Sequence, residues 1–138
     1  MSIYSEKLAK LKREIKTISE RKKKKRWKPN QKIMVDFING VTPKATFSIK
    51  EQTIILFKGD EKKGFRHILE KHYQSYLEAM DIVNIAEPIA QGIKLANEGV
   101  SNEGLEVYMH LKNNKELRLV LKQSEKNLWI VTFYRKGI

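Results

Sequence analysis

The chain contains no cysteine among its 138 residues, which excludes a disulfide framework and any metal site built from thiolates. It also lacks an apolar run approaching the ~20 residues that a transmembrane helix needs. The amino terminus is charged and has no apolar stretch of the kind found in secretory signals. These absences predict a cytoplasmic protein that does not insert stably into a membrane.

Several catalytic signatures are also missing. The sequence has no HExxH pattern, and its pair His67 and His72, spaced i, i+5, would not share one face of a helix. It has neither a phosphate-binding glycine loop nor a GxSxG motif, so nucleotide hydrolysis and triad hydrolysis lack support. We therefore expect no metal and no cofactor.

Positive charge is abundant and unevenly placed. The formal net charge is +12, and residues 1–30 hold 12 Lys and Arg against 3 Asp and Glu. Such an asymmetry predicts a polyanionic partner, nucleic acid first and an anionic membrane second, although a solubilising tail would have the same composition. The predicted RNA-binding run is Arg21, Lys22, Lys23, Lys24, Lys25 and Arg26.

Apolar residues near the amino terminus recur at helical spacing: Tyr4, Leu8, Leu11, Ile15 and Ile18. This stripe would pack on the rest of the chain, pair with a second copy, or dock a partner, so the oligomeric state stays open. Pro29 is expected to halt the helix. We place a basic helical arm at 1–30 and an α+β domain at 31–138.

The domain is predicted to be an antiparallel sheet with two helices packed on one face. Short segments rich in β-branched and aromatic residues predict strands at 32–38, 45–49 and 53–57. Apolar periodicity predicts helices at 64–80 and 81–99. Alternation and short polar links then predict a three-strand meander at 105–111, 117–122 and 128–134.

Alternation also divides the meander between two faces. The predicted helix-covered face holds Leu105, Val107, Met109, Leu111, Leu117, Leu119, Leu121, Trp129, Val131 and Phe133. The opposite face would carry Tyr108, His110, Arg118, Lys122, Thr132 and Tyr134, mixed with Val120 and Ile130. An ordinary solvated face is one interpretation. The other is a surface for phosphate and base recognition, or for phosphoryl transfer within RNA.

The two histidines of 64–80 have different expected roles. His72 falls on or beside the apolar stripe, which is typical of a core or boundary residue. His67 lies near the amino terminus of the helix, where the helix dipole favours a neutral imidazole suited to a general base. We expect RNA to contact the loop residues Lys58, Lys62 and Lys63, and the sheet residues Tyr108, His110 and Lys122.

Two stretches resemble a known group of nucleases. "TIILFKGDEKKGFRHILEKHY" is similar to the entry of the barnase–EndoU–colicin–RelE-like superfamily, especially its phage- and toxin-associated branch, where a strand and loop lead into a helix opening with His-Ile and a later His. "ELRLVLKQSEKNLWIVTFYRK" is similar to its closing hairpin, with Arg118 followed by Thr132 and Tyr134. The connecting "IAQGIKLANEG" also fits.

The resemblance implies metal-independent cleavage of RNA, commonly tRNA, by a toxin that has a cognate antitoxin or immunity protein. Carried over by position, His67 would be the acid–base residue, Arg118 the phosphate clamp, and Thr132 and Tyr134 residues of the active face. The basic arm is not part of this pattern. The alternative hypothesis is a non-catalytic nucleic-acid-binding protein that uses the arm.

Overall fold

The computed structural model describes residues 2–21, 27–95 and 105–136 and shows an α+β fold with an amino-terminal helix. The helices are α1 (Ile3–Arg21), α2 (Pro29–Ile38), α3 (Phe65–Lys71), α4 (Ala79–Val83) and α5 (Glu87–Ala90). The strands are β1 (Ala45–Ile49), β2 (Gln52–Leu56), β3 (Ile93–Leu95), β4 (Leu105–Lys112), β5 (Lys115–Ser124) and β6 (Asn127–Lys136).

The strands form one mixed sheet in the order β1-β2-β6-β5-β4-β3. The predicted meander of β4, β5 and β6 is confirmed, since both of its pairings are antiparallel. The purely antiparallel sheet was wrong, because β2 runs parallel to β6 and pairs with Leu128 and Trp129 near its start. This parallel pair brings the chain that leaves β2 alongside β6.

The predicted strand at 32–38 is helix α2, and this prediction was wrong. Pro29 occupies the first turn, where a missing N–H costs nothing, so it starts a helix instead of ending one. The Lys28 N–H donates to Oε1 of Gln31 at 2.9 Å, which caps that turn. The buried side chains of α2 follow a helical rather than a strand period: Met34, Val35, Phe37 and Ile38.

The predicted helices at 64–80 and 81–99 are much shorter. Helix α3 ends at Lys71, and the chain then turns through Gln74, which has a φ of 72°. Helix α4 begins after Glu78, whose N–H donates to Asp81 at 2.9 Å. Beyond α5, residues 93–95 form strand β3, and a Cβ on Gly92 would lie 2.2 Å from the carbonyl oxygen of Met109. Only glycine allows that approach of β3 to β4.

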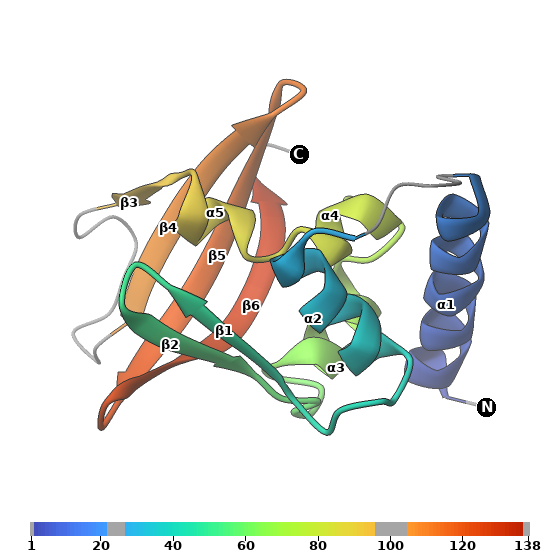
Figure 1. The fold of residues 1–138 in the computed structure, drawn as a ribbon, viewed down its shortest axis with the longest axis horizontal. Helices are drawn as coiled ribbons and strands as arrows, with labels where there is room; N and C mark the ends of the chain where they lie inside the picture. Colours follow the sequence, from blue (N-terminus) through green and yellow to red (C-terminus); the bar gives the residue numbers. More distant parts are fainter. Residues whose placement is uncertain (1, 22–26, 96–104, 137–138) are drawn as a thin grey trace.

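Helix α1 belongs to the same core as the rest of the chain. Leu11 and Ile15 are buried in it, so packing on the chain itself is the role that the apolar stripe has. Lys7 Nζ also donates to the carbonyl oxygens of Glu70 and Tyr73, both at 3.0 Å. Figure 1 shows α1 as the outermost helix, with α2, α3 and α4 between it and the sheet. No described helix is long and apolar enough to cross a bilayer.

The strand register corrects the two sheet faces. Tyr108 pairs with Leu119 and His110 with Leu117, so both side chains lie on the helix-covered face and not beside Arg118. The pairing of β5 with β6 shifts its register between Val120 and Leu121 of β5, which reverses the alternation on β6 from there on. The side chains that were assigned to the wrong face are Leu105, Val107, Met109, Leu111, Tyr108, His110, Trp129 and Ile130.

We call the surface away from the helices the far face. Directly paired residues of neighbouring strands lie on the same face, and Arg118 pairs with Met109 of β4 and with Tyr134 of β6. Lys122 and Trp129 also pair, and Thr132 pairs with Val120. The predicted grouping of Arg118, Lys122, Thr132 and Tyr134 on one face is therefore confirmed.

Candidate active site

A hydrogen bond joins the start of helix α3 to the middle of strand β6. The Gly64 N–H donates to the carbonyl oxygen of Val131 at 2.8 Å. The seven residues of α3 then rise about 10 Å, and the three strand steps from Val131 to Tyr134 cover about 10 Å as well. The end of α3 consequently lies beside Tyr134.

Four side chains are linked here by successive contacts, and we call them the histidine cluster: His67, His72, Tyr134 and Arg118. The His67 and His72 rings lie edge to face, with centroids 5.4 Å apart. The His72 ring is 5.9 Å from the Tyr134 ring, and Tyr134 is the cross-strand partner of Arg118. Sequence segments some 50 to 65 positions apart thus come together, with His72 connecting His67 to the sheet.

His67 is oriented by the loop that precedes α3. Its Nδ1 lies 2.9 Å from the carbonyl oxygen of Glu61. A carbonyl oxygen only accepts, so Nδ1 carries the proton in this contact, and the neutral ring keeps a free lone pair on Nε2. This is the arrangement that a general base requires.

His72 is half-buried and belongs to the cluster rather than to the core stripe. It is the C-cap residue of α3, with φ −121° and ψ −30°, so a helical projection misplaces it. Tyr73 takes the core position and is fully buried. Burial lowers the pKa of His72 to about 4, helped by repulsion from His67 when that ring is protonated and from the ammonium groups of Lys7 and Lys71. The ring is therefore neutral at pH 7. Sequence reasoning missed this residue as a site candidate.

Arg118 is held as a fixed cation on the far face. Its side chain is only 10% exposed, and its Nε donates to Oε2 of Glu116 at 2.7 Å. Burial disfavours the charge, but hydrogen bonds to Glu116 and Tyr134 outweigh it and raise the pKa of Arg118. The guanidinium can thus present its remaining N–H groups to an anion next to the Tyr134 hydroxyl.

The other predicted site residues of the sheet divide into two groups. Thr132 lies two residues before Tyr134 on the far face, and its Oγ1 is buried without a hydrogen-bond partner among the described residues. Tyr108 belongs to the core, and His110 pairs with Glu87 of α5, Nε2 to Oε2, at 3.3 Å. The structure therefore separates Tyr108 and His110 from the cluster.

The three lysines of the 58–64 loop make different contacts. Lys58 Nζ lies over the ring of Tyr4, 5.1 Å from its centroid, and so is directed towards α1. Lys62 and Lys63 are exposed, and their N–H groups both donate to Oδ1 of Asp60. These bonds, that of Lys62 foremost, lower the pKa of the Asp60 carboxyl and fix the loop.

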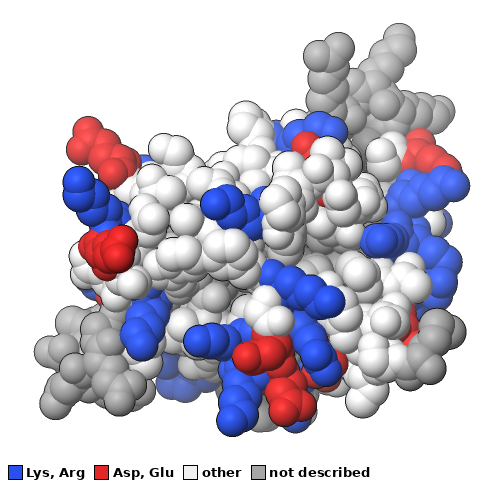
Figure 2. Space-filling view, turned by 90° about the horizontal axis from the view of Figure 1, so that it is seen from below, with Lys and Arg blue, Asp and Glu red and all other residues white. Residues whose placement is uncertain are grey.

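The basic run is described only at its first residue. Arg21 ends α1, whereas Lys22, Lys23, Lys24, Lys25 and Arg26 lie outside the described residues. Figure 2 shows Lys and Arg side chains along the right side of the molecule, where α1 lies. Within the described ranges, no three His, Asp or Glu side chains lie close enough together to bind a metal ion.

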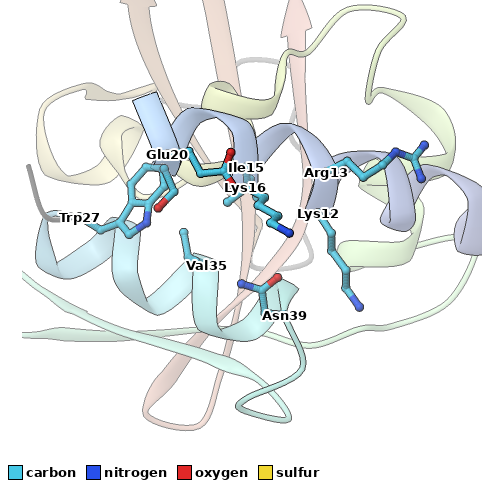
Figure 3. Close-up of a pocket in the computed structure, with 9 residues that line it drawn as sticks. Lys12, Arg13, Ile15, Lys16, Glu20, Trp27, Val35 and Asn39 are labelled. Carbon is cyan, nitrogen blue, oxygen red and sulfur yellow. The ribbon is translucent and has the colours of Figure 1, made fainter. Parts of the chain in front are cut away.

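A separate hollow of about 400 Å³ lies between α1 and α2. Figure 3 shows Trp27 and Glu20 at one end and Lys12 and Arg13 towards the other, with Lys16 between them. Basic side chains on one wall make this groove suited to an anion. None of the residues that line this groove belongs to the histidine cluster, so we treat the groove separately.

No protein-family model matches the chain, and no curated protein is similar enough to count as a match. The function is therefore inferred from the geometry of the histidine cluster and from the basic surface.

Proposed function

We propose that this protein is a metal-independent endoribonuclease that cleaves RNA by acid–base catalysis at the histidine cluster. One observation carries the proposal: a histidine with a free Nε2 is linked through the His72 ring to a phenol and a fixed arginine on the sheet. A base, a cation and a hydroxyl donor are the groups that cleavage by a neighbouring 2′-OH requires.

In the proposed reaction, Nε2 of His67 removes the proton from the 2′-OH of the ribose. The 2′ oxygen then bonds to phosphorus while the bond from phosphorus to the 5′ oxygen breaks. The Tyr134 hydroxyl gives its proton to the departing 5′ oxygen, and Arg118 stabilises both the phosphoryl oxygens and the phenolate. The products are a 2′,3′-cyclic phosphate and a 5′-hydroxyl. The neutral His72 ring contacts both the His67 ring and the Tyr134 ring and so keeps the two in fixed positions.

The substrate is RNA in this proposal, because the nucleophile is the 2′-OH that DNA lacks. Thr132, which the resemblance places on the active face, has a buried Oγ1 and would not contact the phosphate or ribose itself. The resemblance in "FRHILEKHY" and "LRLVLK…TFY" adds a toxin-like role, with tRNA as a target and an antitoxin or immunity protein as a partner. These finer assignments rest on the resemblance alone.

The test is cleavage of total tRNA and of unstructured RNA in the presence of EDTA. Wild type should cut, and His67→Ala and Arg118→Gln should each lose at least 100-fold in rate, the lower end of what acid–base and electrostatic groups contribute. His110→Ala is the matched control, since it removes a histidine on the other face. No cleavage by wild type, or equal losses in His67→Ala and His110→Ala, would refute the proposal.

A second candidate function is nucleic-acid binding without catalysis. The groove between α1 and α2 favours it, because Lys12, Arg13 and Lys16 line it and the predicted RNA-binding run follows the same helix. Lysine-rich surfaces read phosphates with little sequence preference. This function predicts RNA binding by a protein whose His67→Ala variant behaves as wild type.

A further inference from the structure

A second hollow, which lies on the far face, is lined by aromatic rings and lysines. It has a volume of about 350 Å³ and lies where the end of β2, the 58–64 loop and the β5–β6 hairpin meet. Its lining includes Phe57, Lys63, Lys122, Ser124 and Trp129. None of these residues belongs to the histidine cluster, and we call this hollow the aromatic pocket.

Two stacked rings form the apolar wall of the aromatic pocket. The Phe57 and Trp129 rings are nearly parallel, with an interplanar angle of 15° and centroids 4.9 Å apart. Phe57 remains 40% exposed, although it directly follows strand β2. Exposed aromatic surface beside a hollow marks a place where a flat apolar group can bind.

Three lysines lie next to this wall. Lys122 is the cross-strand partner of Trp129, and Lys63 enters from the loop. Lys44 Nζ lies over the ring of Phe57, 5.7 Å from its centroid. All three lysines are exposed. Flat apolar surface next to clustered positive charge matches a nucleobase with its phosphates, whereas an uncharged apolar ligand would leave the lysines without a role.

We propose that the aromatic pocket binds one unpaired base of the RNA strand, with Lys63 and Lys122 at the adjoining phosphates. The inference rests on the proposed function for the identity of the strand. Along β6, Trp129 and Tyr134 are separated by about 15 Å. The base in the pocket therefore lies further along the RNA strand than the nucleotides joined by the phosphate that is cut. Such a subsite selects single-stranded segments, because a paired base cannot expose its face to a ring.

The test uses Trp27→Phe, which leaves Trp129 as the only indole in the chain. Titration with an unstructured 2′-O-methyl oligonucleotide, which lacks the attacking hydroxyl, should quench the Trp129 fluorescence. The same oligonucleotide in a duplex should quench little. Adding Phe57→Ala should weaken binding by roughly fivefold or more, since a base–aromatic stack contributes ~1–3 kcal/mol. Leu111→Ala, an exposed apolar residue on β4, is the control and should not change affinity.

A second variant, Lys122→Ala, keeps the test decisive if Phe57→Ala unfolds, because Lys122 is exposed. It should weaken binding and flatten the salt dependence by about 0.7 in log–log slope. Equal affinity of wild type and both variants would overturn the inference, as would equal quenching by a free mononucleotide and by the oligonucleotide.

The outcomes separate this inference from the proposed function. If Phe57-dependent quenching occurs but wild type cuts no RNA, the pocket stands and the catalytic proposal fails. If wild type cuts RNA but Phe57→Ala and Lys122→Ala bind the uncleavable strand as wild type does, the catalytic proposal stands and the pocket fails.

Discussion

The ring of His72 lies 5.9 Å from the ring of Tyr134, although the first residue caps a short helix and the second lies near the end of the last strand. Through this contact, His67 on helix α3 is connected to the far face of the sheet. The contact exists because α3 starts beside Val131 and ends after seven residues.

The first prediction concerns the titration of His72. Histidine NMR should give His72 a midpoint near pH 4, well below the usual 6.5, because burial and three neighbouring positive groups disfavour its charged form. Lys7→Met should raise the midpoint towards 6.5, since Lys7 is one of those groups. Lys10→Met, an exposed lysine on the same helix, should leave it unchanged. A midpoint near 6.5 in wild type would contradict the placement of His72.

The second prediction is the pH dependence of stability that follows from this shift. The unfolded chain takes up a proton at His72 below about pH 6.5, whereas the folded chain does so only near pH 4. Stability from the neutral ring is thus fully present above pH 6.5 and is lost as the pH falls towards 4. In wild type, the urea midpoint of unfolding should fall between pH 7 and pH 5. The fall should be smaller in His72→Asn, whereas the control His110→Asn should behave as wild type. Equal differences in all three proteins would argue against it.

The sequence predicted the parts of the fold whose pattern is purely local. The three carboxy-terminal strands were recoverable because each alternates in a short run between polar links, and the strands β1 and β2 because each is a short run rich in β-branched and aromatic residues. Segment 32–38 was not, because a buried amphipathic stretch of seven residues fits both periods. Pro29 could have decided it as a helix start rather than a stop.

The candidate site was predicted only in part, for two physical reasons. The grouping of Arg118, Thr132 and Tyr134 follows from alternation, but Tyr108 and His110 needed the interstrand register, which sequence alternation alone does not fix. His72 was placed on the core stripe because a long helix was assumed. The signal that could have corrected it is the neighbouring Tyr73, which fills the core position better than an imidazole does.

The third prediction tests whether α1 is part of the folded core. Leu11 is fully buried, so Leu11→Ala should cost roughly 2–5 kcal/mol of unfolding free energy in urea denaturation. Ile3→Ala, on the same helix but 61% exposed, should change stability by less than about 0.5 kcal/mol. Deletion of residues 1–30 should for the same reason destabilise the whole chain. Equal, small effects of the two substitutions would mean that α1 is detachable.

The fourth prediction concerns the loop that orients His67. Gly59 and Gly40 both have positive φ, 68° and 79°, but a Cβ on Gly59 would lie 2.1 Å from the Lys63 carbonyl oxygen, while one on Gly40 meets nothing within 4 Å. Gly40→Ala should therefore cost about 1 kcal/mol, and Gly59→Ala clearly more. Gly59→Ala should also slow RNA cleavage, because moving the loop moves the Glu61 carbonyl that holds His67. Equal stability and cleavage in the two variants would contradict the rigid loop.

The fifth prediction addresses the groove between α1 and α2. If Lys12 and Lys16 contact RNA phosphates, the double change Lys12→Glu and Lys16→Glu should weaken RNA binding and reduce its log–log salt slope by at least about 1.4, since each phosphate contact on a single strand contributes ~0.7. The control is Lys50→Glu with Lys112→Glu, which alters the net charge equally but lies on hairpins of the sheet. Fluorescence anisotropy between 50 and 200 mM salt measures both variants, a range over which phosphate contacts strongly change affinity. Equal losses in the two would show that net charge, and not this groove, attracts the RNA.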